Sequence, residues 1–272
     1  MQLSKLEEET YEELRKKDLN VFKIRDICLL LKIKKTKAYN IIKALKKKKA
    51  IKPVGKRFFA LNNADDFIIA TSVNHPSYIS FWTALNYYGF SDQNPKKIFI
   101  ATTKYSKDLN NFKFITISKN RFFGYVQINN LIIAEKEKAI IDSLLFPKYS
   151  GGIKEIETSI KKSIDIINQN KLIEYAFRVK NKAVLRRLGF ILEKINLNKE
   201  FQSQQAGGYS LSLQMGTNEN NRSKLWGIKP IWSNKKIIAR LNAKIGKGFE
   251  LLDPSLEKKN NFNKKWLLDI NI

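Results

Sequence analysis

The sequence contains very few of the side chains that bind zinc or transfer protons near neutral pH. Cys28 is its one cysteine and His75 its one histidine. A single cysteine cannot form an internal disulfide, and these two residues cannot supply the four ligands of a structural zinc site. We interpret Cys28 as a helix residue that faces the core, and His75, which precedes Pro76, as a surface or capping residue. Thiol or imidazole catalysis and a metal site are therefore not expected.

Long apolar runs and a phosphate-binding glycine loop are also missing. No segment approaches the roughly 20 apolar residues of a membrane span. Residues 1–10 are acidic and mixed, unlike the apolar core of a signal peptide. The pairs Gly151-Gly152 and Gly207-Gly208 lack the glycine spacing and the Lys-Ser or Lys-Thr of a nucleotide-binding loop. We therefore predict a cytoplasmic protein with no membrane partner and no cofactor.

Acidic residues are scarce beside basic ones. The chain has 51 Lys and Arg against 25 Asp and Glu, and its formal charge of +26 predicts polyanionic partners. Part of this excess is general, because lysine is common along the whole chain. Its distribution is more informative: residues 27–64 contain 12 Lys or Arg and no acid, whereas residues 1–26 contain seven acids. The positive charge is concentrated in one segment near the amino terminus.

That segment has the element order of a helix-turn-helix module. Apolar residues at helical spacing predict a first helix over residues 3–17 and a second over residues 24–31. Residues 32–34 are the expected turn. Thr36 then fits the amino-terminal cap of a third helix that ends near Lys47.

The third helix is expected to have one apolar and one polar face. Its apolar residues recur at i, i+3, i+4 and i+7 and must point into the core: Ala38, Ile41, Ile42 and Leu45. Residue types that bind base edges and phosphates lie on the opposite face: Thr36, Asn40, Lys43 and Lys47. This polar face suits the major groove of DNA.

A wing is expected after the helix, as short strands at residues 50–54 and 57–61 around a Gly55-Lys56 turn. Its tip would place Lys56 and Arg57 against the DNA backbone. The candidate DNA-binding residues are therefore Lys34, Lys35, Thr36, Lys37, Tyr39, Asn40, Lys43, Lys47, Lys56 and Arg57. The alternative is that the lysines at 46–49 are only a solvated helix end, where cations also suit the helix dipole.

The chain as a whole predicts an α+β fold: a winged helix-turn-helix domain over residues 1–62, a mixed α+β domain over residues 63–150, and a helical carboxy-terminal half. The polar residues 62–66 mark the first boundary. In the second domain we expect a mostly antiparallel sheet. Its predicted strands are 98–102, 112–117, 125–128 and 131–134, and its predicted helices are 78–90 and 135–146.

Residues 151–272 are expected to combine helices with a small sheet. Helical spacing predicts three consecutive helices between residues 153 and 195. Strand-like runs follow at 209–215, 225–232 and 236–243, and the tail from residue 258 is expected to dock loosely. Arg186 and Arg187, with neighbouring lysines, raise the alternative of a second phosphate-facing surface.

Three pieces of the chain together resemble a known family. The first is the helix-turn-helix with its hairpin at residues 55–61. The second is Tyr78-Ile79-Ser80 with Ala84-Leu85, Tyr88-Gly89 and Pro95, leading into residues 98–102. The third is Ala134 followed by Glu137-Lys138-Ala139, Asp142 and Leu144-Leu145. These pieces span roughly residues 19–146 and resemble the AbiEi-type antitoxins and related regulators of type IV toxin–antitoxin systems, and residues 185–193 resemble a later helix of that family.

The resemblance implies a regulator that binds its own promoter and antagonises a nucleotidyltransferase-like toxin encoded beside it. It further implies that the carboxy-terminal region makes intersubunit or toxin contacts. Because helix-turn-helix modules occur in many regulators, the antitoxin role depends on the second and third pieces.

Carboxylates leave an enzymatic alternative open. Glu135, Glu137 and Asp142 lie close enough along one expected helix to converge on a cation. The two glutamates stand at its start, however, where the helix dipole and neighbouring lysines stabilise acids without any chemistry. Asp253 with Glu257-Lys258-Lys259 imitates a nuclease cluster, but it lacks the intervening strand that brings such groups around a metal.

We predict a non-enzymatic, sequence-specific repressor of its own operon that resembles AbiEi antitoxins. Its expected partners are double-stranded promoter DNA and a nucleotidyltransferase-like toxin, and repeated half-sites would follow if it is a homodimer. Two alternatives stay open: a nuclease that docks through the winged helix, and a winged-helix regulator without a toxin.

Overall fold

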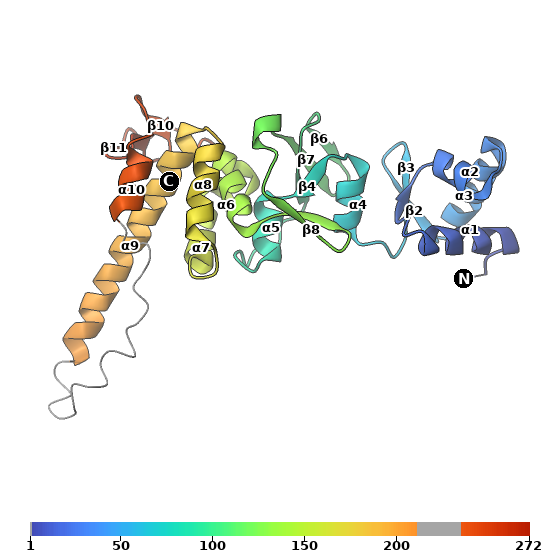
Figure 1. The fold of residues 1–272 in the computed structure, drawn as a ribbon, viewed down its shortest axis with the longest axis horizontal. Helices are drawn as coiled ribbons and strands as arrows, with labels where there is room; N and C mark the ends of the chain where they lie inside the picture. Colours follow the sequence, from blue (N-terminus) through green and yellow to red (C-terminus); the bar gives the residue numbers. More distant parts are fainter. Residues whose placement is uncertain (1, 211–234) are drawn as a thin grey trace. The chain divides into compact units, whose positions relative to one another are not determined.

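The computed structural model describes residues 2–210 and 235–272 and has an α+β fold (Figure 1). The chain divides into two compact units, Met1–Ala139 and Ile140–Ile272. The first contains a winged helix-turn-helix and a six-stranded sheet, and the second contains helices and a three-stranded sheet. The predicted fold class is confirmed, whereas domain boundaries at residues 62 and 150 stay predictions.

Three helices and three short strands form the winged helix-turn-helix. The helices are α1 (Lys5–Lys16), α2 (Ile24–Leu31) and α3 (Lys35–Lys47), and the strands are β1 (Val21–Phe22), β2 (Ile51–Val54) and β3 (Phe58–Leu61). The strand order is β1-β3-β2, and both pairs are antiparallel. These bounds confirm the predicted helices and wing. Strand β1 has no counterpart in the sequence pattern, because two residues are too few to show a period.

One apolar cluster holds these elements together. Every helix and strand of the module, or the residue beside it, contributes to its buried members: Leu14, Phe22, Ile27, Ala38, Ile41, Ile42, Leu45, Ala50, Ile51 and Leu61. Burying each large aliphatic side chain contributes roughly 1.5 to 3 kcal/mol. Helices as short as these are marginal alone, so this packing stabilises them.

Helix α3 begins earlier than predicted. Thr36 already lies inside it, and Lys34 occupies the cap position without a capping hydrogen bond. The preceding turn sets the start instead, because Lys32 has a left-handed backbone (φ 54°). Ile33 packs against the core, and its N–H donates to the Cys28 carbonyl at 3.1 Å. The predicted Thr36 cap is wrong, because the buried anchor at Ile33 outweighs the preference for a capping hydroxyl.

A mixed sheet of order β6-β7-β5-β4-β9-β8 forms the rest of the first unit. Its strands are β4 (Ser77–Ile79), β5 (Ile98–Thr102), β6 (Lys107–Leu109), β7 (Phe112–Thr116), β8 (Tyr125–Ile128) and β9 (Leu131–Ala134). The helical elements of this region are α4 (Asp66–Val73), α5 (Phe81–Tyr87), η1 (Lys119–Arg121) and α6 (Lys136–Leu145). Three neighbouring strand pairs are antiparallel and two are parallel, in agreement with the prediction.

Residues 78–90 do not form the single helix predicted for them. Tyr78 and Ile79 belong to β4, where Tyr78 lies opposite Ala101 of β5 and Ile79 lies opposite Ile133 of β9. Helix α5 begins only at residue 81. A continuous apolar run suits a central strand and a buried helix equally well, so pairing with distant strands decides the outcome.

Helices dominate the second unit. They are η2 (Pro147–Tyr149), α7 (Gly152–Ser163), α8 (Gln169–Arg178), α9 (Lys182–Ser210) and α10 (Lys235–Asn242). Helices α7, α8 and α9 confirm the three predicted from the sequence. A small sheet of order β10-β12-β11 follows, with β10 (Glu250–Leu251), β11 (Phe262–Asn263) and β12 (Leu268–Asp269). Within the described parts of the chain, no helix has both the length and the apolar character needed to cross a membrane.

The small sheet lies later in the chain than predicted. Most of the predicted strand at 236–243 lies in α10, where Ile237 and Leu241, four residues apart, are both buried on one helix face. Residues 209–210 end α9. The remainder of the predicted strand 209–215, and all of the predicted strand 225–232, lie outside the described residues.

The carboxy-terminal tail packs firmly instead of docking loosely. Trp266 is 0% exposed, and its indole N–H donates to Glu193 of α9 at 2.6 Å. Leu268 is also fully buried, in the central strand of the small sheet. The prediction of a loose tail is wrong because its apolar residues are buried against α9, which lies far earlier in the sequence.

Candidate nucleic-acid interface

Helix α3 separates a core face from a solvent face as its sequence predicts. Ala38, Ile41, Ile42 and Leu45 are buried. All eight candidates on the helix and its preceding turn are exposed: Lys34, Lys35, Thr36, Lys37, Tyr39, Asn40, Lys43 and Lys47. The exposed face therefore presents amide, hydroxyl, phenol and ammonium groups from a helix that the core holds in place.

The wing places the other two candidates at the tip of a hairpin. Gly55 has φ 67°, a left-handed conformation that favours glycine, and it allows β2 to turn into β3. Lys56 and Arg57 follow it and are exposed. At the base of α2, Lys23 Nζ lies 4.7 Å from the centroid of the Phe58 ring, so a cation–π contact links this helix to β3.

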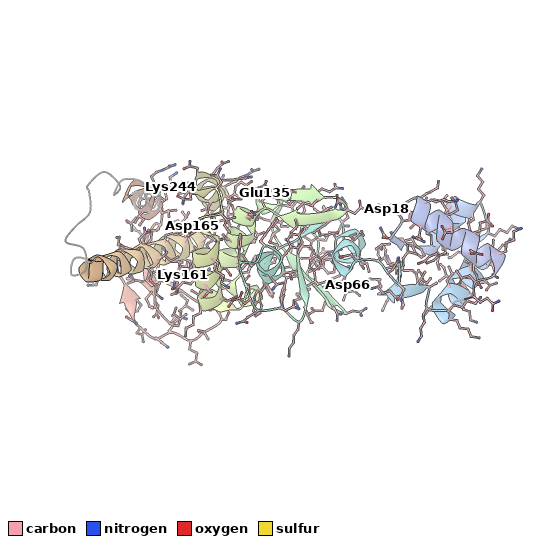
Figure 2. All side chains as sticks on the ribbon, turned by 90° about the horizontal axis from the view of Figure 1, so that it is seen from below. Asp18, Asp66, Glu135, Lys161, Asp165 and Lys244 are labelled. Carbon is pink, nitrogen blue, oxygen red and sulfur yellow. The ribbon has the colours of Figure 1, made fainter. Side chains whose placement is uncertain are left out.

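Two lysines of the basic segment are engaged within the protein. Lys48 Nζ lies 2.5 Å from Glu7 Oε2, and Lys52 Nζ lies 2.9 Å from Oδ1 of Asp66, at the start of α4 (Figure 2). Hydrogen bonds from Lys48 and from the Ser4 backbone hold the pKa of Glu7 below its ordinary value. The sequence carries no signal for the first pair, because its members are 41 residues apart.

The candidate cations themselves have no acidic neighbour. Among the residues that the structure describes, no carboxylate lies within 4.0 Å of Lys34, Lys35, Lys37, Lys43, Lys47, Lys56 or Arg57. Uncompensated cations on one surface produce a positive potential that attracts anions. The arrangement is therefore suited to a phosphate backbone.

The carboxylates considered for an enzyme lie in structural surroundings. Glu137 and Asp142 on α6 are buried, at 7% and 0% exposed. Lys138, between them in the sequence, is 0% exposed, and its Nζ lies 4.9 Å from the Phe123 ring centroid. Over residues 2–210 and 235–272, no three His, Cys, Asp or Glu side chains are grouped so that they could hold a metal ion.

Tyr88 carries a strongly perturbed pKa beside this helix. Its hydroxyl donates to the Ala134 carbonyl at 2.8 Å. Burial, with smaller contributions from Tyr87, Glu135 and Glu137, raises the pKa of Tyr88 to about 12. The phenol therefore stays protonated at neutral pH and acts as a hydrogen-bond donor.

Asp253 caps a helix. Its Oδ2 accepts the Ile153 N–H at the start of α7 at 3.1 Å, and its Oδ1 accepts the Ser255 N–H at 2.9 Å. The backbone N–H of Asp253 in turn donates to Asn271 Oδ1 at 2.9 Å. Both carboxylate oxygens of Asp253 are thus engaged by backbone groups, which is a structural role.

Arg186 and Arg187 do not form the second phosphate-facing surface considered from the sequence. They are 1% and 4% exposed. The Arg187 guanidinium donates three hydrogen bonds of 2.8 to 3.1 Å to the carbonyls of Leu144, Leu251 and Leu252. Arg186 Nη2 donates to the carbonyls of Ile245 and Lys247 at 2.8 and 3.0 Å. Buried carbonyls need donors, and these two arginines supply them.

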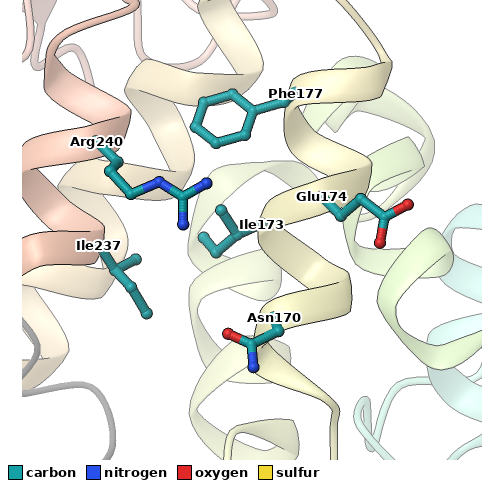
Figure 3. Close-up of a pocket in the computed structure, with 6 residues that line it drawn as sticks. All are labelled: Asn170, Ile173, Glu174, Phe177, Ile237 and Arg240. Atoms are coloured by element: carbon teal, nitrogen blue, oxygen red, sulfur yellow. The ribbon is translucent and has the colours of Figure 1, made fainter.

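A cavity of about 360 Å³ lies between α8 and α10 (Figure 3). Apolar and polar side chains line it: Asn170, Ile173, Glu174, Phe177, Ile237 and Arg240. Arg240 Cζ and Lys244 Nζ lie 5.7 and 4.8 Å from the Phe177 ring centroid. The two helices that form the cavity are distant in the sequence, so no local pattern predicts it.

Comparison with known proteins bears on the fold. No protein-family model matches the chain, and no curated protein matches it. A solved structure, that of the RV2827C protein from Mycobacterium tuberculosis, is similar with a TM-score of 0.61 and 12% sequence identity. The similarity covers 98% of this chain and 92% of that chain. At this low identity the likeness concerns the fold alone.

Proposed function

We propose that this chain is a DNA-binding transcription regulator that binds double-stranded DNA upstream of its own gene. The observation that carries the proposal is the two-faced helix α3, whose apolar residues are all buried while its eight candidate residues, counted with the turn, are exposed. A recognition helix needs this combination, because base readout requires a rigid helix with free polar side chains. The protein would then act in the cytoplasm, as a regulator and not as an enzyme.

The exposed residues divide into two roles. Asn40 is placed to read base edges, since an amide forms a bidentate pair with adenine, and Lys43 can reach guanine or a phosphate. The other helix candidates and the wing residues Lys56 and Arg57 are suited to the backbone, which contributes affinity without sequence preference.

We extend the proposal to an antitoxin role of the AbiEi type, with a nucleotidyltransferase-like toxin as the second partner. The support is the sequence resemblance over residues 78–102 and 134–145. Two copies on repeated or palindromic half-sites would match the usual symmetry of helix-turn-helix regulators.

The first experiment compares binding of the purified full chain to its own upstream DNA and to an unrelated duplex between about 50 and 200 mM salt. We expect a clear preference for the upstream DNA, weakened by Lys43→Gln but not by Lys154→Gln, which removes an exposed lysine on α7. Equal and steeply salt-dependent binding to both duplexes would contradict sequence-specific regulation.

The antitoxin role has a separate test. Expression of the neighbouring gene alone should arrest growth, and co-expression of this chain should restore it. Lys43→Gln, which weakens only DNA binding, should restore growth as well as the unmodified chain does. If the neighbouring product is not toxic, or if co-expression restores nothing, the antitoxin role fails while regulation still stands.

A further inference from the structure

The tip of the wing lies against the edge strand of the six-stranded sheet. A Cβ atom built on Gly55 would lie only 2.8 Å from Leu109 Cδ1 in β6. Because side chains alternate along a strand, Lys107 projects from the same face of β6 as Leu109. The cross-strand partners agree, since Lys107 lies opposite Phe114 and Leu109 lies opposite Phe112, two residues apart on β7. Lys107 therefore continues the surface that begins at the wing tip.

Lys107 belongs to an exposed basic loop between β5 and β6. Lys104 and Lys107 are exposed, and Tyr105 between them is 92% exposed. Thr116 holds the loop in place: its hydroxyl donates to the Lys104 carbonyl at 2.6 Å and lies 2.8 Å from Ser106 Oγ. The charge of Lys104 also adds to the effect of burial in lowering the pKa of Lys107, so the two cations lie near each other.

The acidic residue of β6 does not neutralise this surface. Asp108 alternates to the opposite face of the strand, where it pairs with Lys97 at 3.1 Å and with Lys113 at 2.6 Å. Over the described residues, neither Lys104 nor Lys107 has a carboxylate within 4.0 Å. One face of the edge strand is thus neutralised, and the face beside the wing remains cationic.

We propose that the DNA interface extends from the wing onto this edge of the sheet, where Lys104, Tyr105 and Lys107 contact the sugar–phosphate backbone beside the wing. Ammonium groups and a phenol hydroxyl are typical donors to phosphate oxygens. Such contacts carry no base information, so they add affinity and length to the bound site without changing its sequence preference. The inference rests on the proposed function.

The test uses the full chain with Lys104→Gln and Lys107→Gln combined. Each lost phosphate contact should reduce the slope of log K against log salt by about 0.9, so the double variant should lose roughly 1.8 on both upstream and unrelated duplexes. Lys104→Arg with Lys107→Arg keeps both charges and should retain the slope. The matched control is Lys154→Gln with Lys258→Gln, which removes two exposed cations elsewhere and should also retain it.

A second measurement shortens the upstream duplex from each end in turn. The unmodified chain should lose affinity when the flank beside the wing is removed, whereas the Lys104→Gln, Lys107→Gln variant should be insensitive to that flank. Tyr105→Phe, which removes only the hydroxyl, should give a smaller loss on the longer duplex. Thermal unfolding of each variant should match the unmodified chain, because these side chains are exposed.

The outcomes separate the two proposals. If Lys43→Gln weakens binding while the Lys104→Gln, Lys107→Gln variant keeps the original slope and flank dependence, the extension is wrong and the winged-helix interface stands. An equal loss in the Lys154→Gln, Lys258→Gln control also overturns the extension, because it would show only a net-charge effect. If the unmodified chain binds no duplex, both proposals fail.

Discussion

Lys48, at the carboxy-terminal end of α3, pairs with Glu7 of α1, with 2.5 Å between Nζ and Oε2. The same carboxylate accepts the backbone N–H of Ser4 at 2.8 Å and so closes the capping box of α1. One glutamate therefore begins the first helix and ties it to the end of the third. This pair helps to fix the orientation of the helix that carries the exposed polar face.

We expect Glu7→Gln to destabilise the module at pH 7 and to have little effect near pH 3. The pKa of Glu7 is lowered in the folded chain, so its stabilising contribution is complete above the unfolded-state pKa of about 4.3 and is lost as the pH falls through the folded value. Urea unfolding at both pH values measures this. Glu9→Gln, at an exposed position of the same helix, is the control. An equal effect of Glu7→Gln at both pH values would disprove the charge pairing.

Asn40→Ala and Lys43→Ala should affect DNA binding differently. Loss of a bidentate base contact at Asn40 should reduce discrimination at one base pair by about 1 to 3 kcal/mol. Loss of a phosphate contact at Lys43 should weaken binding to all sequences and reduce the salt slope by about 1. Binding to a set of single-base variants of the upstream site separates the two effects. If Asn40→Ala leaves base preference unchanged, Asn40 does not read the groove.

Gly189→Ala should destabilise the second unit. A Cβ at this position of α9 would lie 2.1 Å from Cη2 of the buried Trp266, and overpacking of this kind costs about 1 to 3 kcal/mol or more. In the presence of Trp266→Ala the same substitution should cost much less, because the clashing ring is gone. Urea unfolding of the two single variants and the double variant measures the coupling. Additive losses would show that the two residues do not touch.

Arg187→Lys should lower stability without changing intrinsic DNA affinity. Lysine cannot reproduce the three hydrogen bonds of the guanidinium, and each buried carbonyl left unpaired costs about 1 to 3 kcal/mol. Lys154→Ala, on the surface of the same unit, should change stability by no more than about 0.5 kcal/mol. A loss of DNA affinity in fully folded Arg187→Lys protein would instead restore the idea of a phosphate-facing arginine.

The candidate interface follows closely from local sequence. Helical spacing alone is enough to place Ala38 and Leu45 in the core and Asn40 and Lys43 on the surface, because one helix turn fixes which residues share a face. The wing is equally local, since Gly55 supplies the turn between two adjacent strands. A pattern confined to a dozen residues carries its own geometry.

Elsewhere the sequence was ambiguous until distant parts of the chain met. Tyr78 and Ile79 suit a helix as well as a strand, and pairing with β5 and β9 makes them a strand. Arg187 suits a basic surface by composition, yet buried carbonyls from two distant segments require its guanidinium. Composition cannot show which polar groups will be buried, because that depends on which segments pack together.

The amino-acid sequence by itself thus settled the α+β class, the winged helix-turn-helix and the two faces of α3, since these depend on periodicities of two to four residues. Only the tertiary structure decided the roles of Lys48, of Arg187 and of the buried tail around Trp266. Each of those roles depends on a contact between residues more than 40 positions apart, and such contacts leave no local pattern.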